Sequence, residues 1–117
     1  MATLQIDVLE LPQAPLDAAA DFYLRELPEI RDDSDILPDH DLVIVFEPAS
    51  HEHRAWRLAA VQELAREMAP RRVNALASAD GAATAAGLTY LAGAAGLTGQ
   101  YLPLDNVGAG FVVLPPA

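Results

Sequence analysis

The feature that most constrains the fold is Leu42–Phe46, a run of five apolar residues in which apolar and polar side chains do not alternate. A strand with one face in water alternates, so an unbroken apolar run of this length is typical of a parallel strand covered on both faces. Parallel neighbours are joined by crossover connections, which are usually helices. The run therefore predicts a central strand of an α/β sheet with helices on both faces.

Other segments show strand and helix patterns in turn. Thr3–Leu11 places Leu4, Ile6 and Val8 on one face, which predicts a half-buried strand in an outer position of the sheet. Three further short strands are expected at Val73–Ala77, Gln100–Leu104 and Phe111–Leu114. Strands that alternate with helices form βαβ units. We therefore expect residues 1–117 to form one Rossmann-like α/β domain, a three-layer fold with a mainly parallel sheet of about four to five strands.

The first helix is expected at Leu16–Leu27, before Pro28, which stops it. Its apolar positions at helical spacing are Leu16, Ala20, Tyr23, Leu24 and Leu27. The acidic segment Glu29–Asp41 is interpreted as a loop in which Ile36 and Leu37 contact the core.

Two more helices are expected further along the chain. The second begins after Ser50, a candidate N-cap, and ends near Ala69. Its apolar stripe consists of Leu58, Val61, Leu64, Ala65 and Met68. The third begins at Asp80, another candidate cap, and runs to about Ala95, with Gly96 as its C-terminal cap.

The acidic residues bound the choice of partners and compartment. The formal net charge is −10, and thirteen of the 17 acidic residues lie in residues 1–52. They either keep the protein soluble or form a docking face for a basic partner, and they argue against nucleic acid. Met1–Leu11 has no basic residue and is not a signal peptide, and no apolar run is long enough to span a bilayer. We therefore expect a cytoplasmic protein without a membrane partner.

Missing residue types restrict the chemistry. The chain has no cysteine, which excludes disulfides, thiolate metal sites and cysteine nucleophiles. All 7 basic residues are arginine, so no lysine is present as a Schiff base, phosphate ligand or general base. All 7 glycines lie at Gly81 or later.

Two stretches resemble the short-chain dehydrogenase/reductase (SDR) family. Leu64–Ala77, which contains Arg72, Val73 and Asn74 in succession, is similar to the end of that family's catalytic-tyrosine helix and the strand that follows. Leu91–Val107, which contains the sequence Thr-Gly-Gln at 98–100, is similar to the family's Thr-Gly-Gln turn, last strand and Asp-Gly-Gly end. With Leu42–Phe46 as the preceding strand, the resemblance covers about residues 41–107 of a truncated member. It implies that the strands at 42, 73 and 100 are parallel neighbours.

The family's reactive groups are not matched. In the family, a tyrosine phenol exchanges a proton with the substrate, and a lysine four residues later lowers the pKa of that phenol. The corresponding positions here are Ser50 and Arg54. A serine hydroxyl is a far weaker acid than a phenol, and arginine does not give up its proton. The resemblance therefore implies a scaffold without the family's catalytic pair.

The expected cofactor turn departs from the family as well. A dinucleotide pyrophosphate needs a glycine turn after the first strand. Leu11–Leu16 has two prolines and no glycine there, and Asp17 follows. The family's substrate loop is missing, because Ser78–Gly81 leads quickly into a helix. We expect neither a bound cofactor nor a catalytic residue in this chain.

Two groups of polar residues remain as candidates. Glu47, Ser50, Ser78 and Asp80 follow strands, where they either cap helices or line a ligand pocket at the carboxyl ends of the strands. The other group is His51–His53, in which the two histidines are two residues apart. On a helix such residues point in different directions, so we expect solvated side chains and no metal site.

The second helix also predicts a contact between subunits. Trp56, Ala59 and Ala60 lie off its apolar stripe and are expected to form a homodimer interface. The competing interpretation is a monomer in which the first helix covers this face.

The resemblance and its departures together predict a catalytically inactive SDR-like protein that acts as an oligomeric binding or structural module. One alternative is an oxidoreductase subunit that a partner chain, such as a full-length SDR, completes. The other is a small-ligand sensor that uses the crevice at the strand ends.

Overall fold

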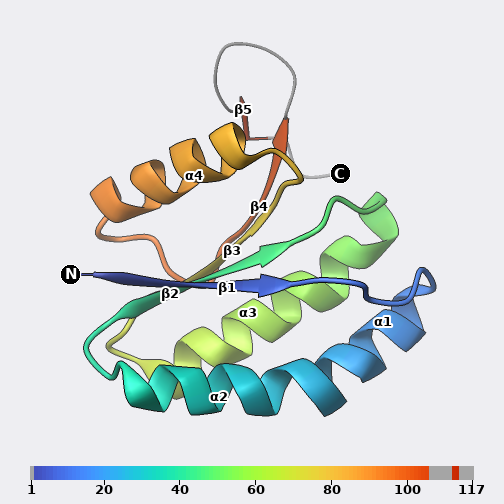
Figure 1. Cartoon of the computed structure of the whole chain (residues 1–117), viewed down its shortest axis with the longest axis horizontal. Coiled ribbons are helices and arrows are strands. Elements are labelled where there is room, and N and C mark those ends of the chain that lie inside the picture. The colour runs from blue at the N-terminus through green and yellow to red at the C-terminus, as the bar shows by residue number, and fades with distance from the viewer. Residues whose placement is uncertain (1, 106–111, 114–117) are drawn as a thin grey trace.

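The computed structural model describes residues 2–105 and 112–113. Its strands are β1 (Thr3–Val8), β2 (Asp41–Phe46), β3 (Val73–Ala77), β4 (Tyr101–Asp105) and β5 (Val112–Val113). Its helices are α1 (Pro15–Asp21), the π-helical turn η1 (Phe22–Glu26), α2 (Leu27–Ile36), the 3₁₀ turn η2 (His51–His53), α3 (Arg54–Met68) and α4 (Gly81–Gly93). Figure 1 shows α1, α2 and α3 on one face of the sheet and α4 on the other.

The five strands form one sheet in chain order, β1-β2-β3-β4-β5. β1 to β4 are parallel, and β5 is antiparallel to β4. The predictions of a Rossmann-like α/β fold, of parallel neighbours at β2, β3 and β4, and of an outer place for β1 are therefore confirmed. Of the strand predicted at Phe111–Leu114, the first and last residues lie outside the described part of the chain.

The edge position of β1 follows from its alternating side chains. Gln5 and Asp7 are paired in register with Val43 and Val45 of β2, which pack toward α4. Both polar side chains are exposed, so water covers the α4 side of β1. Polar residues on an edge strand also discourage further strands from pairing there.

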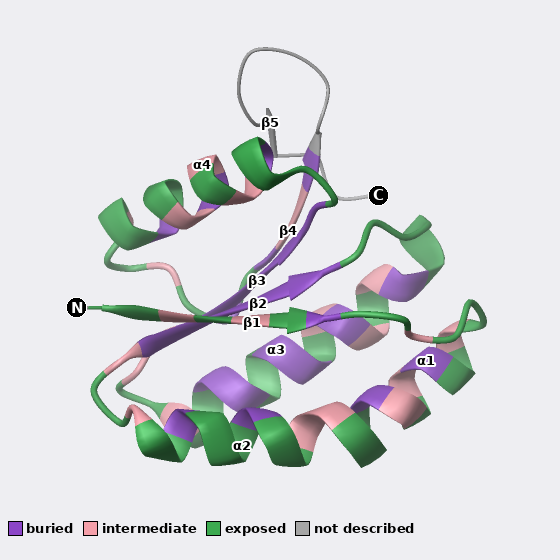
Figure 2. Cartoon of the chain, viewed as in Figure 1, coloured by how far each residue is buried: buried purple, intermediate pink, exposed green. Residues whose placement is uncertain are grey.

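β2 is buried along its whole length, as an unbroken apolar run predicts. Two groups of core residues pack on opposite faces of the sheet, and Figure 2 shows the buried strands between them. Members of the group on the α1 to α3 side include Val8, Phe22, Ile30, Leu42, Ile44, Phe46, Val61, Leu64, Val73 and Tyr101. Members on the α4 side are Val43, Val45, Leu76, Ala83, Leu91 and Leu104.

The predicted helix stop at Pro28 is wrong. The helical segment continues through it to Ile36, so most of the predicted loop at Glu29–Asp41 is α2. The π-helical turn η1 lies directly before Pro28, and the N–H of Leu27 donates to the carbonyl oxygen of Phe22, five residues back. Pro28 therefore falls in the first turn of α2, where its missing N–H costs little.

The predicted apolar face of the first helix is also wrong. Leu16 and Leu24 are 86% and 77% exposed, and Ile36, expected to contact the core, is 74% exposed. The fully buried positions are instead Ala18, Phe22, Ile30 and Ser34, which are spaced by multiples of four. An α-helix with 3.6 residues per turn drifts away from a spacing of four, and a π turn holds more residues per turn, so η1 keeps this stripe facing the sheet.

The ends of α3 and α4 differ partly from expectation. Ser50 makes no side-chain capping hydrogen bond, and η2 precedes α3. Asp80 caps α4 by accepting from the N–H groups of Ala82 and Ala83, as predicted. α4 ends at Gly93 with Ala94 as its C-cap, so Gly96 is not the cap. In residues 2–105 and 112–113, no helix has both the length and the apolar character needed to cross a membrane.

An exposed ion pair connects α2 to α3. Arg31 donates from Nε to Oε2 of Glu67 at 3.0 Å and from Nη2 to Oε1 at 2.7 Å. These hydrogen bonds hold the pKa of the Glu67 carboxyl below its usual range. Because both side chains are about half exposed, solvent screens the pair and it contributes little to stability.

Candidate functional site

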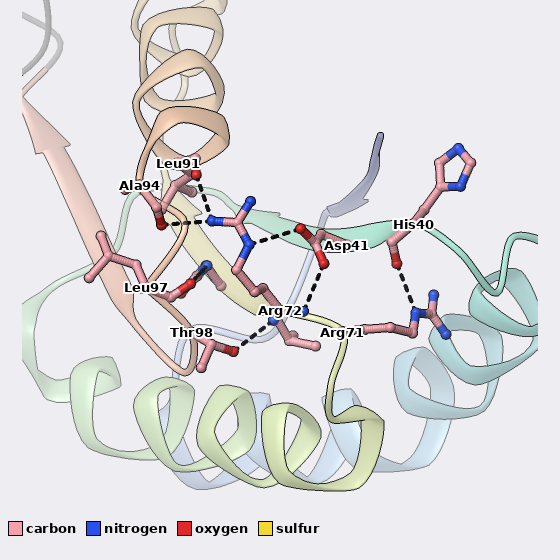
Figure 3. Close-up of polar contacts among 10 residues, drawn as sticks. His40, Asp41, Arg71, Arg72, Leu91, Ala94, Leu97 and Thr98 are labelled. Carbon is pink, nitrogen blue, oxygen red and sulfur yellow. Dashed lines mark hydrogen bonds and ion pairs between the residues drawn. The ribbon is translucent and has the colours of Figure 1, made fainter. Parts of the chain in front are cut away.

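The motifs that resemble the SDR family gather at the amino end of the sheet. Asp41, at the start of β2, accepts from the backbone N–H of Arg72 at 2.8 Å and from its Nε at 2.9 Å. Nη1 of Arg72 donates to the carbonyl oxygens of Leu91 and Ala94 at 3.0 and 2.7 Å (Figure 3). One arginine therefore joins β2, β3 and the C-terminal end of α4, where a cation also complements the helix dipole.

The Thr-Gly-Gln turn joins β3 in the same region. The hydroxyl of Thr98 accepts from the N–H of Val73 at 3.1 Å, and the N–H of Gly99 donates to the Val73 carbonyl at 2.7 Å. Asn74 donates to the Leu97 carbonyl at 3.0 Å and accepts from the N–H of Gln100 at 3.0 Å. Gly99 has a φ of 72°, a conformation that favours glycine. These hydrogen bonds set the position of β4 beside β3.

The opposite end of the sheet contains a hollow of about 410 Å³. It lies where β1 and β2 end, the edge to which their arrowheads point in Figure 1, and the start of α3 forms its base. Its lining residues are Val8, Leu11, Pro12, Gln13, Glu47, Pro48, Ala49, Ser50, His53 and Arg57. The carboxyl ends of parallel strands are where open α/β sheets bind ligands, and this volume lies in the range of small-molecule sites.

The loop after β1 is held in place as one wall of this hollow. The N–H of Glu10 donates to Oε1 of Glu47 at 2.7 Å, and Nε2 of His53 lies 2.9 Å from the carbonyl oxygen of Gln13. Nδ1 of His53 accepts from the indole N–H of Trp56 at 3.1 Å, which assigns the proton to Nε2. Glu10 has a φ of 61°, a conformation that is costly for a residue other than glycine. The loop is thus fixed to both β2 and η2.

Arg57 is a buried cation at the base of the hollow, with a residue exposure of only 3%. Its Nη1 donates to the carbonyl oxygen of Glu47 at 2.9 Å and to the phenol oxygen of Tyr101 at 3.1 Å. The guanidinium carbon lies 4.5 Å from the centre of the Phe46 ring, with the Trp56 ring 5.7 Å away. Aromatic faces attract a cation, so this cage partly offsets the loss of water.

The guanidinium is nevertheless not fully satisfied. Its Nε is buried and has no hydrogen-bond partner, and Nη2 makes no hydrogen bond within the described residues. The ion pairs in that part of the chain involve Arg25, Arg31, Arg66 and Arg72, and none includes Arg57. A buried charge without an opposite charge is destabilising. Of the seven arginines, Arg57 is therefore the one placed to receive an anion at the strand ends.

A second hollow of about 290 Å³ lies on the α4 side of the same edge. Glu47, Ser78 and Asp80 line it, whereas Ser50 lines only the first hollow and Glu47 is common to both. The four predicted pocket residues are thus divided between two hollows. The hydroxyl of Ser78 donates to the Asp80 carbonyl at 3.1 Å, and Asp80 caps α4, so these two side chains serve the helix start. Whether either hollow takes a ligand stays a prediction.

A family model described as "SDR-like: Short chain dehydrogenase-like protein" matches residues 6–104. The chain belongs to this SDR-like family. The match begins within β1, so it includes the N-terminal part that the resemblance at residues 41–107 left out. Comparisons with curated proteins and with solved structures found no match. The prediction of an SDR-like scaffold is therefore confirmed, and family membership alone assigns no activity.

In the SDR-like chain, the two residues at the positions of the family's tyrosine and lysine lie in different environments. Ser50 is exposed at the rim of the first hollow, and Arg54, the first residue of α3, is half-buried outside the lining. The buried cation is Arg57, one helical turn further on, which the sequence reasoning did not single out. A signal was present, because Arg57 lies four and seven residues before Val61 and Leu64 and so continues the apolar stripe of α3.

The expectation that His51–His53 is solvated is wrong for its last residue. His51 and Glu52 are exposed, but His53 is buried, with its two ring nitrogens bonded to Gln13 and Trp56. The physical reason is that η2 turns this residue inward beneath the β1 loop. Among the described residues, no cluster of three or more His, Asp or Glu side chains could hold a metal ion.

The expected interface residues are mostly covered within the SDR-like chain itself. Ala60 is 1% exposed, and Trp56 is half-buried, with its ring centre 5.5 Å from that of Phe22 and 5.7 Å from that of Phe46. Only Ala59 is exposed. The free face assumed for Trp56 and Ala60 is therefore wrong, because η1 and the sheet cover it. The homodimer itself stays a prediction.

Proposed function

We propose that this SDR-like chain is a catalytically inactive binding protein that holds a small ligand in the hollow at the ends of β1 and β2. The observation that supports it most is the 410 Å³ hollow with the buried Arg57 at its base. Ligand sites combine apolar wall with a few convergent polar groups, and the lining of this hollow contains residues of both kinds. Arg57 supplies such a group, while Val8 and Leu11 supply apolar wall.

The residues around the hollow favour binding over hydride transfer. The chain contains no lysine, and Ser50 stands at the position of the family's phenol. Tyr101 is not among the lining residues of the hollow, since its phenol oxygen is turned to Arg57 beneath it. The loop after β1 directs the Gln13 carbonyl at His53 and contains two prolines, so it is a poor donor surface for a pyrophosphate.

Calorimetry with NAD⁺ and NADP⁺ tests the first half of the proposal. We expect no saturable heat at micromolar concentrations, which correspond to roughly −8 kcal/mol of binding free energy. We also expect no oxidation of NADPH in the presence of small ketones, aldehydes or quinones. Saturable dinucleotide binding or turnover by the isolated chain would contradict the proposal.

Thermal denaturation with a panel of small organic molecules tests the second half, because any ligand that binds only the folded state raises the Tm. Ala49 is an exposed lining residue, so Ala49→Phe should fill the hollow and abolish the shift. Ala92→Phe, at an exposed position of α4 that lines neither hollow, is the matched control. A Tm shift that survives Ala49→Phe would place the ligand elsewhere.

A further inference from the structure

We propose that the ligand of this hollow is a small monocarboxylate with an apolar body, bound through the guanidinium of Arg57. The inference rests on the proposed function, since it names the class of molecule that the same hollow takes. Three observations support it: Arg57 has N–H donors without acceptors, its charge has no ion-pair partner among the described residues, and the hollow is lined by both polar and apolar residues.

The donors of Arg57 are fixed and incompletely used. Nη1 is held between the Glu47 carbonyl and the Tyr101 hydroxyl, and the guanidinium carbon lies over the Phe46 ring. An arginine has five N–H donors in a rigid fork. Nε is covered and unpartnered, and Nη2 is neither bonded nor fully covered. Nη2 therefore offers the accessible N–H groups, on the edge of the fork that suits a carboxylate.

A single negative charge on the ligand would compensate the buried positive charge of Arg57. The partly buried Arg72 lies against Asp41, and three exposed arginines pair with acids, whereas the partly buried Arg54 and Arg71 form no ion pair within the described residues. Within the part of the chain that the structure describes, Arg57 has no such partner, although it is more deeply buried than any of them. A carboxylate against Nη2 would neutralise the buried cation and satisfy its free donors in one contact.

The walls limit the ligand to a monoanion. Glu47 brings a carboxylate to the rim, where Oε1 accepts from the Glu10 N–H, so a second negative charge on the ligand would meet repulsion there. The lining also includes Val8, Leu11 and Ala49, which suit an apolar body next to the carboxylate. Polyanions such as nucleotides are disfavoured further by the net charge of −10.

The probe pair is benzoate and its neutral isostere benzamide, measured by NMR titration of the full chain labelled with ¹⁵N. The arginine Nε–H resonances report directly on the seven guanidinium groups. We expect benzoate to shift the Arg57 Nε–H signal and backbone signals of the hollow, and to bind at least about tenfold more tightly than benzamide, as a charged hydrogen-bond partner would. Inorganic phosphate should bind more weakly than benzoate.

Two matched variants test the role of the fork. Arg57→Lys keeps the charge but loses the planar fork, and we expect it to weaken benzoate binding by about tenfold. Arg54→Lys makes the same change one turn earlier on α3, outside the lining, and should leave the affinity within about twofold. If Arg57→Lys does not fold, the wild-type comparison and the Arg57 resonance still decide the question.

The outcomes separate this inference from the proposed function. Equal binding of benzoate and benzamide in the hollow would leave the binding function standing and overturn the carboxylate. Stronger binding of phosphate, or benzoate binding that leaves the Arg57 signal unmoved, would also overturn it. Failure of benzoate to bind up to about 10 mM, a level that detects even millimolar affinity, overturns the inference. The proposed function fails only if no molecule of the wider panel is held in the hollow.

Discussion

Replacing Arg72 with methionine should destabilise the fold more than any other single arginine substitution. The side chain makes an ion pair with Asp41 and two hydrogen bonds to carbonyl groups at the end of α4 (Figure 3). Methionine keeps most of the apolar stem but none of these contacts. Asp41, whose residue exposure is 4%, would keep only the backbone N–H of residue 72 as a donor.

Arg72→Met should lower the free energy of unfolding by about 4 kcal/mol. Removing one partner of a buried ion pair costs roughly 3–5 kcal/mol, and the lower figure applies because the Arg72 side chain is 18% exposed. The loss of a cation at the α4 C-terminus adds about 1 kcal/mol. The entropy of unfolding is about 2.1 cal/mol/K per residue, so for 117 residues the Tm should fall by about 15 °C.

The assay is urea and thermal denaturation followed by circular dichroism, with Arg71→Met as the matched control. Among the described residues, Arg71 donates only to the carbonyl oxygens of His40 and Leu37, at 2.8 and 3.2 Å, and has no carboxylate partner. Arg71→Met should therefore lower the free energy of unfolding by about 1 kcal/mol. If Arg72→Met lowers the free energy of unfolding no more than Arg71→Met does, the ion pair between Arg72 and Asp41 does not stabilise the amino end of the sheet.

Two further predictions concern packing and assembly. Gly87→Ala should lower the free energy of unfolding by about 1 kcal/mol, because the new Cβ would lie 2.9 Å from a methyl carbon of the fully buried Leu76. The Cβ of Gly93→Ala would meet nothing within 4 Å, so this control should raise the free energy of unfolding by about 0.5 kcal/mol. Denaturant titrations of both variants measure the difference. If a homodimer forms through α3, light scattering should show a dimer that Ala59→Asp converts to a folded monomer, since Ala59 is the exposed member of the predicted interface. Trp56→Asp is unsuitable for this test because the indole packs on Phe22 within the same chain. A monomeric wild-type protein would contradict the predicted interface.

The sheet could be predicted from the sequence because its two signals are independent of distant contacts. An unbroken apolar run marked β2 as central, and alternation in Thr3–Val8 marked β1 as an edge. The path through Pro28 could not be predicted in the same way. It depends on η1, which is set by where Phe22 meets Phe46 and Trp56, and these contacts exist only after α1 packs on α3.

The candidate site was predictable only in location. Strand ends pointed to the edge at which both hollows lie, and Glu47 and Ser50 line the first of them. Arg57 was missed because a charged residue is expected on the solvent side of a helix, and its burial requires Phe46 and Tyr101 from two separate strands. His53 was missed for a similar reason, since its partner is a backbone carbonyl forty residues away in sequence.

The hydrogen bonds of Arg72, Asn74 and Thr98 and the candidate site occupy opposite ends of the sheet, so these family-like residues do not line the hollow. Arg72, Asn74 and Thr98 make their hydrogen bonds at the amino end. A strand of five residues such as β3 rises roughly 16 Å at 3.3 Å per residue. Within the described residues, Arg57 and His53 share no hydrogen-bond partner with Arg72, Asn74 or Thr98, and the hydrogen bond that Arg57 makes to the second motif stretch is to the Tyr101 hydroxyl. Substitutions at such separations act almost independently on stability. The hydrogen bonds at the amino end therefore fix strand register whatever side chains line the hollow at the carboxyl end.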